Sequence, residues 1–282
     1  MTGDLSVTAL YTSEAWAFGD IANAELLRTE EAGAVFGITN KALRVGRLFR
    51  RDAPSLPHSL VQRHQMIDHL LREWRGGQVL ELASGLSPRG IGVSYDHDRR
   101  HVEVDLRPMI ARKRELLARS IEGQEVALRS NLHLIPGDIE KVNFDRLPLE
   151  ADQPVFVIVE GLCMYLEAAR QRALWAKIAA LIAGRPGSAL VFDLVPFSEQ
   201  PPAGLIGKAL GGLMKMFTGG QTFAEDNRRR EDVVSDLAAA GFGDVQLFEP
   251  GEVGADWGLS FLDVPTQQLI FRCAISDEGH RS

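Results

Sequence analysis

The stretch Gln78-Val-Leu-Glu-Leu-Ala-Ser-Gly-Leu-Ser-Pro-Arg-Gly90 joins an apolar strand to a turn that contains glycine. In doubly wound α/β folds, the turn at the carboxyl end of the first strand brings backbone close to a nucleotide cofactor. Here Ala83 stands in place of the first glycine of a dinucleotide fingerprint, Gly85 is kept, and Ser87 holds the third place. A pyrophosphate-binding loop needs its glycines, so the turn favours a cofactor without phosphates over a dinucleotide. An ordinary strand-to-helix turn is the alternative.

Strands and helices alternate in the sequence around this turn. The pattern predicts strands at residues 78–83, 101–105, 132–136, 154–160, 188–194, 245–248 and 268–275, and helices at 60–75, from Pro108, at about 167–183 and at about 229–240. Such alternation predicts a parallel, doubly wound sheet. The last two strands are separated only by a loop with Gly251, Gly254 and Pro265, so we expect the last strand to be antiparallel and to lie at the sheet edge.

The chain divides into a cap, a main domain and an insert. Residues 1–59 are predicted to form a helical N-terminal cap, and its basic stretch 41–51 places Arg44, Arg47 and Arg51 on one helix face. Residues 60–282 are predicted to form the α/β domain. An insert at about 196–226, rich in Gly and Met, suits a lid over a substrate, and a dimer contact or a membrane-touching helix are the alternatives.

Composition excludes several classes of protein. The 282 residues are 45% hydrophobic and 24% charged, which is typical of a soluble globular domain. The formal net charge of −7 argues against a nucleic-acid partner. Cys163 and Cys273 have no neighbours at metal-ligand spacing, so we predict no metal site, no disulfide framework and a cytoplasmic location. No apolar run approaches the ~20 residues that span a bilayer.

Two acids follow predicted strands and suit a nucleoside. Asp105 ends the second strand, where a carboxylate accepts hydrogen bonds from both ribose hydroxyls, and a solvated strand-end Asp is the alternative. Asp138 follows the third strand, where class I methyltransferases place an acid against the adenine amino group and an apolar neighbour, here Ile139, against the ring. This position favours S-adenosylmethionine (SAM) over NAD.

Arg63 and Glu160 suit the methionine end of SAM. Arg63 shares the sheet-facing side of its helix with Ile67, Leu70 and Trp74, so its buried charge needs an anionic partner. That partner is either the SAM carboxylate or an acid in a structural salt bridge. Glu160 ends the fourth strand and could hold the SAM amino group.

Several further side chains are candidates for the acceptor pocket or for proton transfer. Tyr165 follows the fourth strand and could line the acceptor pocket. His64 and His133 could act as bases, although a lone histidine is more often structural. Cys163 is expected to fill apolar space rather than to act as a nucleophile.

Taken together, these motifs resemble the leucine carboxyl methyltransferase superfamily, in particular its bacterial branch of polyketide-type, tetracenomycin-like carboxyl O-methyltransferases. The matching pieces are Thr8-Ala-Leu-Tyr-Thr12 with Trp16, Arg63-His-Gln-Met-Ile-Asp68, Glu81-Leu-Ala-Ser-Gly-Leu-Ser-Pro-Arg-Gly90, Val102-Glu-Val-Asp-Leu106, Gly137-Asp-Ile139 and Glu160-Gly-Leu-Cys-Met-Tyr-Leu166. The resemblance implies a class I SAM-dependent methyltransferase fold, a Rossmann-like doubly wound sheet with an antiparallel last strand, carrying the cap and the lid.

The resemblance also implies residue roles. It assigns Arg63 to the SAM carboxylate, Ala83 and Gly85 to the cofactor loop, Asp105 to the ribose, Asp138 and Ile139 to the adenine, and Glu160 to the methionine end. Tyr11, Arg89 and Tyr165 are the candidates for the acceptor pocket, while the catalytic residues are not identified.

The predicted reaction is methyl transfer from SAM to a carboxylate of a small, polyketide-like metabolite. A carboxylate is already ionised at pH 7, so this transfer needs no general base. The alternatives are a phenolic acceptor with His64 or His133 as the base, a protein C-terminal carboxylate, a non-catalytic SAM-binding module and, less favoured, an NAD(P)-dependent oxidoreductase. The sequence makes no prediction of the oligomeric state.

Overall fold

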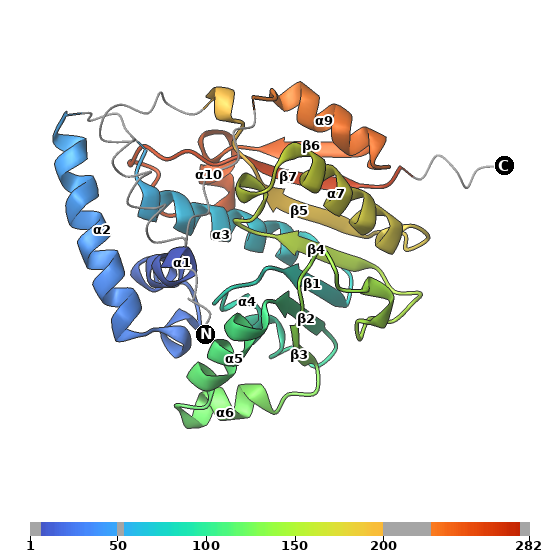
Figure 1. Ribbon diagram of the computed structural model, residues 1–282, viewed down its shortest axis with the longest axis horizontal. Coiled ribbons are helices and arrows are strands. Elements are labelled where there is room, and N and C mark those ends of the chain that lie inside the picture. The colour runs from blue at the N-terminus through green and yellow to red at the C-terminus, as the bar shows by residue number, and fades with distance from the viewer. Residues whose placement is uncertain (1–6, 50–53, 200–226, 277–282) are drawn as a thin grey trace.

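Within the described residues, seven strands form one mixed sheet (Figure 1). The computed structural model describes residues 7–49, 54–199 and 227–276. The strand order is β3-β2-β1-β4-β5-β7-β6. The strands are β1 Gln78–Leu82, β2 Arg100–Asp105, β3 Leu132–Pro136, β4 Val155–Val159, β5 Ala189–Asp193, β6 Asp244–Phe248 and β7 Ile270–Ala274. Strands β1 to β5 pair in parallel, whereas β7 is antiparallel to both of its neighbours. The predicted doubly wound α/β class with an antiparallel last strand is confirmed.

Helices cover both faces of the sheet (Figure 1). They are α1 Val7–Phe18, α2 Glu30–Phe49, α3 Leu56–Glu73, α4 Arg89–Val93, α5 Arg107–Leu117, α6 Ile121–Ala127, α7 Ala168–Ile182, α9 Arg230–Ala239 and α10 Pro250–Trp257, with short 3-10 helices at Ala24–Leu27, Phe144–Arg146, Cys163–Tyr165 and Phe197–Glu199. Helices α7 and α9 pack on one face, and α3 and α10 on the other. No helix in the described ranges has both the length and the apolar character needed to cross a membrane.

The two faces of the sheet differ in polarity near β1 and β2. On β4, Val157 packs toward α7 while Phe156 and Ile158 pack toward α3, as expected for a strand that is buried on both faces. The positions of β1 and β2 that face the α3 side include Glu81 and Glu103, which lie opposite each other in register. Both are fully buried, so charged side chains occupy part of the interior beneath α3 and α4. Such charges require buried partners.

Two expectations about the C-terminal strands were wrong. Strand β7 is not at the edge: it lies between β5 and β6, so β6 forms the edge. A helix, α10, also occupies part of the connection that the glycines had marked as loop. Pro250 stands in the first turn of α10, where its missing N–H costs nothing, and Gly258 ends the helix in the left-handed conformation with φ of 66°.

In the described part of the N-terminal region, α1 and α2 are separated by residues 19–29, which contain only a short 3-10 helix. Helix α1 packs on α3 through the buried side chains of Tyr11, Ala15 and Leu60, and α2 lies outside α1, away from the sheet (Figure 1). The basic stretch at 41–51 falls on the end of α2; Arg51 and the side chains of Arg44 and Arg47 lie outside the described residues, as does most of the expected lid, residues 200–226.

Candidate active site

The turn after β1 contains two residues with a left-handed backbone. Ala83 has a φ of 54° and Gly85 a φ of 55°, so both residues are left-handed. A left-handed alanine is strained, and such residues concentrate at functional sites. Ala83 is tied to β2 by a hydrogen bond from its N–H to the Val104 carbonyl oxygen (2.8 Å). Its neighbour Ser84 has a buried hydroxyl without a hydrogen-bond partner in the described part of the chain.

Asp105 joins this turn to β2. Its Oδ2 accepts the Gly85 N–H and its Oδ1 accepts the Leu106 N–H, both at 2.6 Å. Burial raises the pKa of Asp105, and the two backbone donors oppose that rise. Each carboxylate oxygen can accept a second hydrogen bond, so Asp105 still has acceptor capacity for two hydroxyl groups.

The turn after β3 lies beside Asp105, because the Gly137 N–H donates to the Asp105 carbonyl oxygen at 2.8 Å. Asp138 is partly exposed, and its ion pair with Lys141 lowers its pKa. Ile139 is 9% exposed and belongs to the core between the sheet and α7. Leu106, in contrast, is 58% exposed directly after Asp105. Leu106 was not predicted as a site residue, although it stands directly after Asp105, the predicted ribose acid.

Arg63 is buried, as its helix face predicted, and it contacts two acids from distant strands. Its Nε donates to Glu160 Oε1 at 3.0 Å and its Nη1 donates to Asp193 Oδ2 at 3.3 Å. The structural salt bridge is therefore present. Among the described residues, no acceptor takes a hydrogen bond from Nη2. Its N–H groups therefore remain as donors for a ligand. Sequence reasoning had not identified Asp193.

Glu160 lies at the centre of this group of charges. Its Oε1 accepts from Arg63, and its Oε2 lies 2.9 Å from Arg89 Nη2 and 3.1 Å from His64 Nδ1. Burial alone would raise its pKa, but His64, Arg89 and Arg63 together hold the pKa of Glu160 well below its usual range. Glu160 is therefore an anion at neutral pH.

Arg89, from the Ser-Pro-Arg-Gly stretch, connects Glu160 to two more acids. Its Nε donates to Asp68 of α3 and its Nη1 to Glu81 of β1, while Nη2 donates to Glu160. The side chain is only 2% exposed. Because all of its nitrogens are engaged, these contacts favour a role in holding α3, β1 and β4 together over direct contact with an acceptor.

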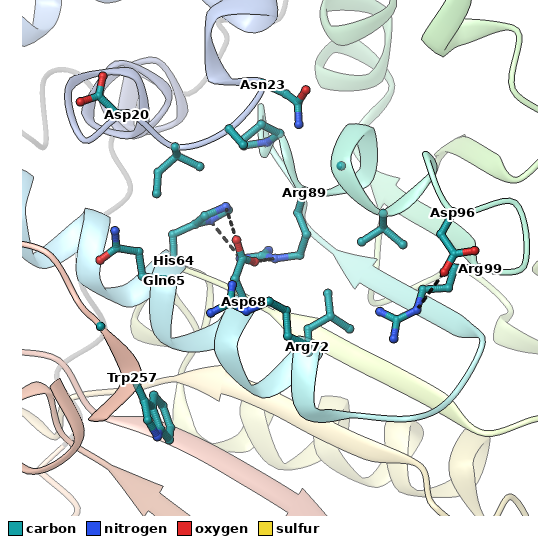
Figure 2. Close-up of a pocket in the computed structure, with 17 residues that line it drawn as sticks. Asp20, Asn23, His64, Gln65, Asp68, Arg72, Arg89, Asp96, Arg99 and Trp257 are labelled. Carbon is teal, nitrogen blue, oxygen red and sulfur yellow. Dashed lines mark hydrogen bonds and ion pairs between the residues drawn. The ribbon is translucent and has the colours of Figure 1, made fainter. Parts of the chain in front are cut away.

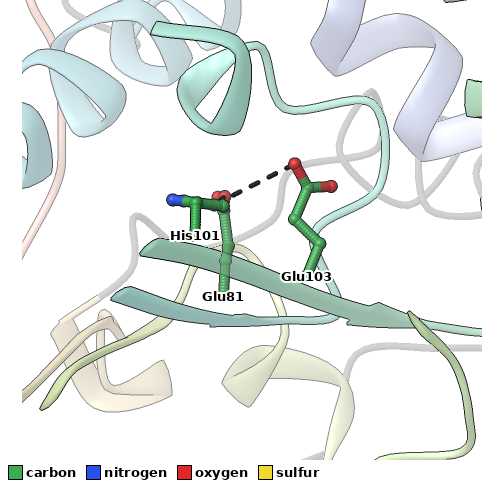
Figure 3. Close-up of side chains that lie close together, drawn as sticks. All are labelled: Glu81, His101 and Glu103. Atoms are coloured by element: carbon green, nitrogen blue, oxygen red, sulfur yellow. Dashed lines mark hydrogen bonds and ion pairs between the residues drawn. The ribbon is translucent and has the colours of Figure 1, made fainter. Parts of the chain in front are cut away.

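Glu81, His101 and Glu103 come close together behind Arg89. Figure 3 shows their side chains rising from β1 and β2 toward one another, with His101 Nε2 lying 3.1 Å from Glu81 Oε2 and 3.9 Å from Glu103 Oε1. Three such side chains could hold a cation, but Arg89 already pairs with Glu81 and Lys113 with Glu103. The charges of the two glutamates are therefore neutralised by neighbouring side chains of the protein, and we interpret the cluster as structural.

Of the two tyrosine candidates, Tyr11 lies inside the cap and Tyr165 lies against it. The Tyr11 hydroxyl donates to Asn40 of α2 at 2.7 Å, and the ring is 6% exposed inside the cap. Tyr165 hydrogen-bonds with Thr8 of α1, and burial raises its pKa. Helix α1 also places Trp16 on His64, with 4.7 Å between the ring centroids. The cap thus covers Tyr165 and His64 directly.

The remaining candidates for nucleophile or base are not placed for chemistry. Burial raises the pKa of the Cys163 thiol well above its usual value, as expected for an apolar filler. His133 on β3 pairs with Val102 on β2, and Val102 lies three residues before Asp105, the end of β2. At about 3.3 Å per residue, His133 therefore lies about 10 Å from the carboxyl edge of the sheet. His64 is fully buried within the Arg89 and Glu160 contacts.

A cavity of about 480 Å³ lies on the α3 and α4 side of this network. Figure 2 shows His64, Asp68 and Arg89 converging at its centre, with Trp257 and Arg99 on opposite sides. Asp20 and Asn23, from the connection after α1, border it. His64 and Arg89 line this cavity and also contact Glu160, which is not among the lining residues.

Comparison with solved structures supports the fold. A candidate exported protein from Bordetella parapertussis is 15% identical with a TM-score of 0.54, and the match covers 96% of this chain and 95% of that one. A candidate O-methyltransferase from Nostoc punctiforme PCC 73102 is 16% identical with a TM-score of 0.51, covering 95% and 69%. The SAM-dependent methyltransferase SibL in its apo form is 15% identical with a TM-score of 0.50, also covering 95% and 69%. At such identities the likeness shows the fold alone.

Sequence comparisons give the family. No curated protein matches the chain significantly. The sequence profile of the leucine carboxyl methyltransferase family matches residues 7–179, more than half of the chain and the part that contains Arg63, Asp105 and Glu160. The chain therefore belongs to the leucine carboxyl methyltransferase family and is a SAM-dependent methyltransferase.

Proposed function

We propose that this enzyme transfers the methyl group of SAM to a carboxylate oxygen of a small, polyketide-like metabolite and forms a methyl ester. The observation that carries the proposal is the absence, among the described residues, of an accessible side chain placed to remove a proton from an acceptor. His64 is fully buried and contacts Glu160 and Arg89 through Nδ1, His133 is distant from the carboxyl edge, and the Cys163 thiol is buried. A carboxylate acceptor needs no base, whereas a phenol with a pKa of about 10 usually does.

The residues at the carboxyl edge fit SAM. The unpartnered Ser84 hydroxyl, the spare acceptor capacity of Asp105 and the exposed Leu106 side chain surround the turn where a nucleoside would lie. We assign Asp105 to the ribose hydroxyls, and Ala83 and Gly85 to the backbone turn beneath them.

The two ends of SAM have different partners in this proposal. Asp138 accepts from the adenine amino group while Leu106 and Ile139 flank the ring, and Leu106 is the more accessible of the two. Arg63 Nη2 binds the carboxylate of the methionine part, and Glu160 provides negative charge for its ammonium group.

When bound, SAM supplies a methyl group that its sulfonium sulfur activates. The residues of this chain contribute alignment and exclusion of water. Thr8 and Trp16 hold the cap against Tyr165 and His64, and in this proposal the cap covers the acceptor. In this proposal the predicted cap, residues 1–59, covers the domain predicted to begin at residue 60; α3 spans this boundary.

The test uses matched acceptors. Purified enzyme and methyl-labelled SAM are incubated with aromatic polyketide acids, with the corresponding phenols that lack the carboxyl group, and with a peptide ending in a free carboxylate. We expect label in the small acids, released by mild alkali as methyl esters are. Asp105→Asn is the control, and it should lose transfer together with SAM binding.

Each other outcome contradicts the proposal in its own way. Alkali-stable label in the phenols would indicate a phenolic O-methyltransferase, and label confined to the peptide would indicate a protein carboxyl methyltransferase. SAM binding without transfer to any acceptor of the three classes would favour a non-catalytic module.

A further inference from the structure

Arg63 is held between the ends of two neighbouring strands. Glu160, which follows β4, accepts a hydrogen bond from Arg63 Nε at 3.0 Å. Asp193, the last residue of β5, accepts one from Nη1 at 3.3 Å. The Arg63 side chain is 6% exposed, and those of the two acids 5% and 1%. These contacts leave Nη2 as the guanidinium nitrogen without a recorded hydrogen bond in the described part of the chain.

Asp193 holds the backbone of the site as well as the guanidinium. Its Oδ1 accepts the Gly161 N–H at 2.5 Å while its Oδ2 accepts from Arg63. Gly161 is left-handed with a φ of 70°, and a Cβ there would lie 3.0 Å from Nη2 and 3.2 Å from Nη1 of Arg63. The turn after β4 therefore packs closely against the guanidinium, and Asp193 fixes both.

The two acids differ in what else they bind. Glu160 also contacts Arg89 and His64, so its charge does not depend on Arg63 alone. Asp193 forms its recorded ion pair with Arg63 only, within the described residues. Asp193 thus serves the placement of Arg63, whereas Glu160 belongs to the wider network.

We propose that Asp193 is a positioning residue for SAM recognition: by holding Arg63 Nη1 and the Gly161 turn, it directs Nη2 toward the carboxylate of the methionine part. A free arginine side chain loses rotamer entropy when it binds a ligand, and a preorganised one loses less of it. Asp193 therefore determines how strongly the enzyme distinguishes a ligand with this carboxylate from one without it. The inference rests on the proposed SAM site.

The test compares two ligands that differ only in that carboxylate: SAM and its decarboxylated form, S-adenosyl-3-methylthiopropylamine. Dissociation constants are measured by calorimetry without an acceptor, for the wild type and for Asp193→Asn. Asparagine keeps the size and the acceptor for Gly161 but loses the ion pair. We expect SAM to bind about tenfold more weakly to the variant, and decarboxylated SAM to change less than twofold.

Control variants separate positioning from general damage. Asp105→Asn should weaken both ligands by the same factor, because the ribose is common to them. If Asp193→Asn does not fold, Gly161→Ala provides the second variant: its Cβ would press on Nη2 and should also reduce the preference for SAM.

Two results would overturn the inference while leaving the SAM site standing. These are an equal loss for both ligands, or unchanged or tighter SAM binding in Asp193→Asn. A wild type that binds neither ligand would instead refute the proposed SAM site and, with it, the inference.

Discussion

The buried pair of Lys113 and Glu103 allows a stability prediction that does not depend on any ligand. Both side chains are 0% exposed, and the Lys113 ammonium also donates to the Ser87 carbonyl oxygen in the turn after β1. Glu103 Oε1 has no hydrogen-bond partner among the described residues, so Lys113 supplies the main compensation for this carboxylate. Replacing Lys113 by methionine should therefore leave a buried charge uncompensated.

Removal of one partner from a buried ion pair typically costs about 3–5 kcal/mol. For a domain of this size, 1 kcal/mol corresponds to roughly 2–4 °C, so Lys113→Met should lower the melting temperature by about 10 °C. Urea unfolding followed by circular dichroism measures the free energy of unfolding directly. Arg119→Met is the control, because Arg119 and Glu115 form an exposed pair, and such pairs contribute at most about 1 kcal/mol.

The double variant Lys113→Met with Glu103→Gln is the decisive comparison. Because it removes the charge that Lys113 neutralises, it should recover at least about 2 kcal/mol relative to Lys113→Met alone. A loss below about 1 kcal/mol in Lys113→Met, or no recovery in the double variant, would show that the pair is not the compensated buried charge that its geometry indicates.

Two further predictions concern the stability of the protein at low pH and the proposed adenine site. Burial raises the pKa of Glu81, but Arg89, His101 and Lys113 outweigh this effect and lower the pKa from 4.5 to about 2. The ionised carboxylate therefore stabilises the fold fully above about pH 4.5, and this contribution is lost as the pH falls toward 2. The urea midpoint should decline across that window, and less steeply in Glu81→Gln; equal slopes in the two proteins would count against the assignment. Leu106→Ala should leave the melting temperature within about 2 °C because the side chain is exposed, and should weaken SAM binding about tenfold, as expected for loss of an apolar contact worth about 1.5 kcal/mol. Unchanged affinity in calorimetry would remove Leu106 from the adenine site.

The elements that the sequence predicted well are those whose signal is local. Strand β4 is an unbroken apolar run, and both of its faces are buried. The α3 helix places Arg63 on its inner side through a repeat of three and four residues, and that arginine is indeed buried. Local patterns also predicted the antiparallel last strand, but they could not show that β7 inserts beside β5, because strand neighbours are chosen by contacts between distant segments.

Helix α10 is an element that the sequence did not predict. Gly251 and Gly254 marked a loop, yet Gly254 lies inside α10 with the Leu262 side chain packed so closely that a Cβ would meet it at 2.4 Å. A glycine that permits close packing and a glycine that breaks a helix are identical in the sequence. Only the neighbouring residues in space distinguish them.

The sequence by itself determined the class of fold, the order of the cofactor motifs and the need of Arg63 for an anionic partner. The tertiary structure decided which anions these are: Glu160 and Asp193 lie 97 and 130 positions away along the chain, and Arg89 links Glu160 to Glu81 and Asp68. The physical reason is that a buried charge specifies the sign of its partner but not its position. The parallel register of β1, β4 and β5 brings their carboxyl ends to one edge, and α3 places Arg63 against the acids that follow or end β4 and β5.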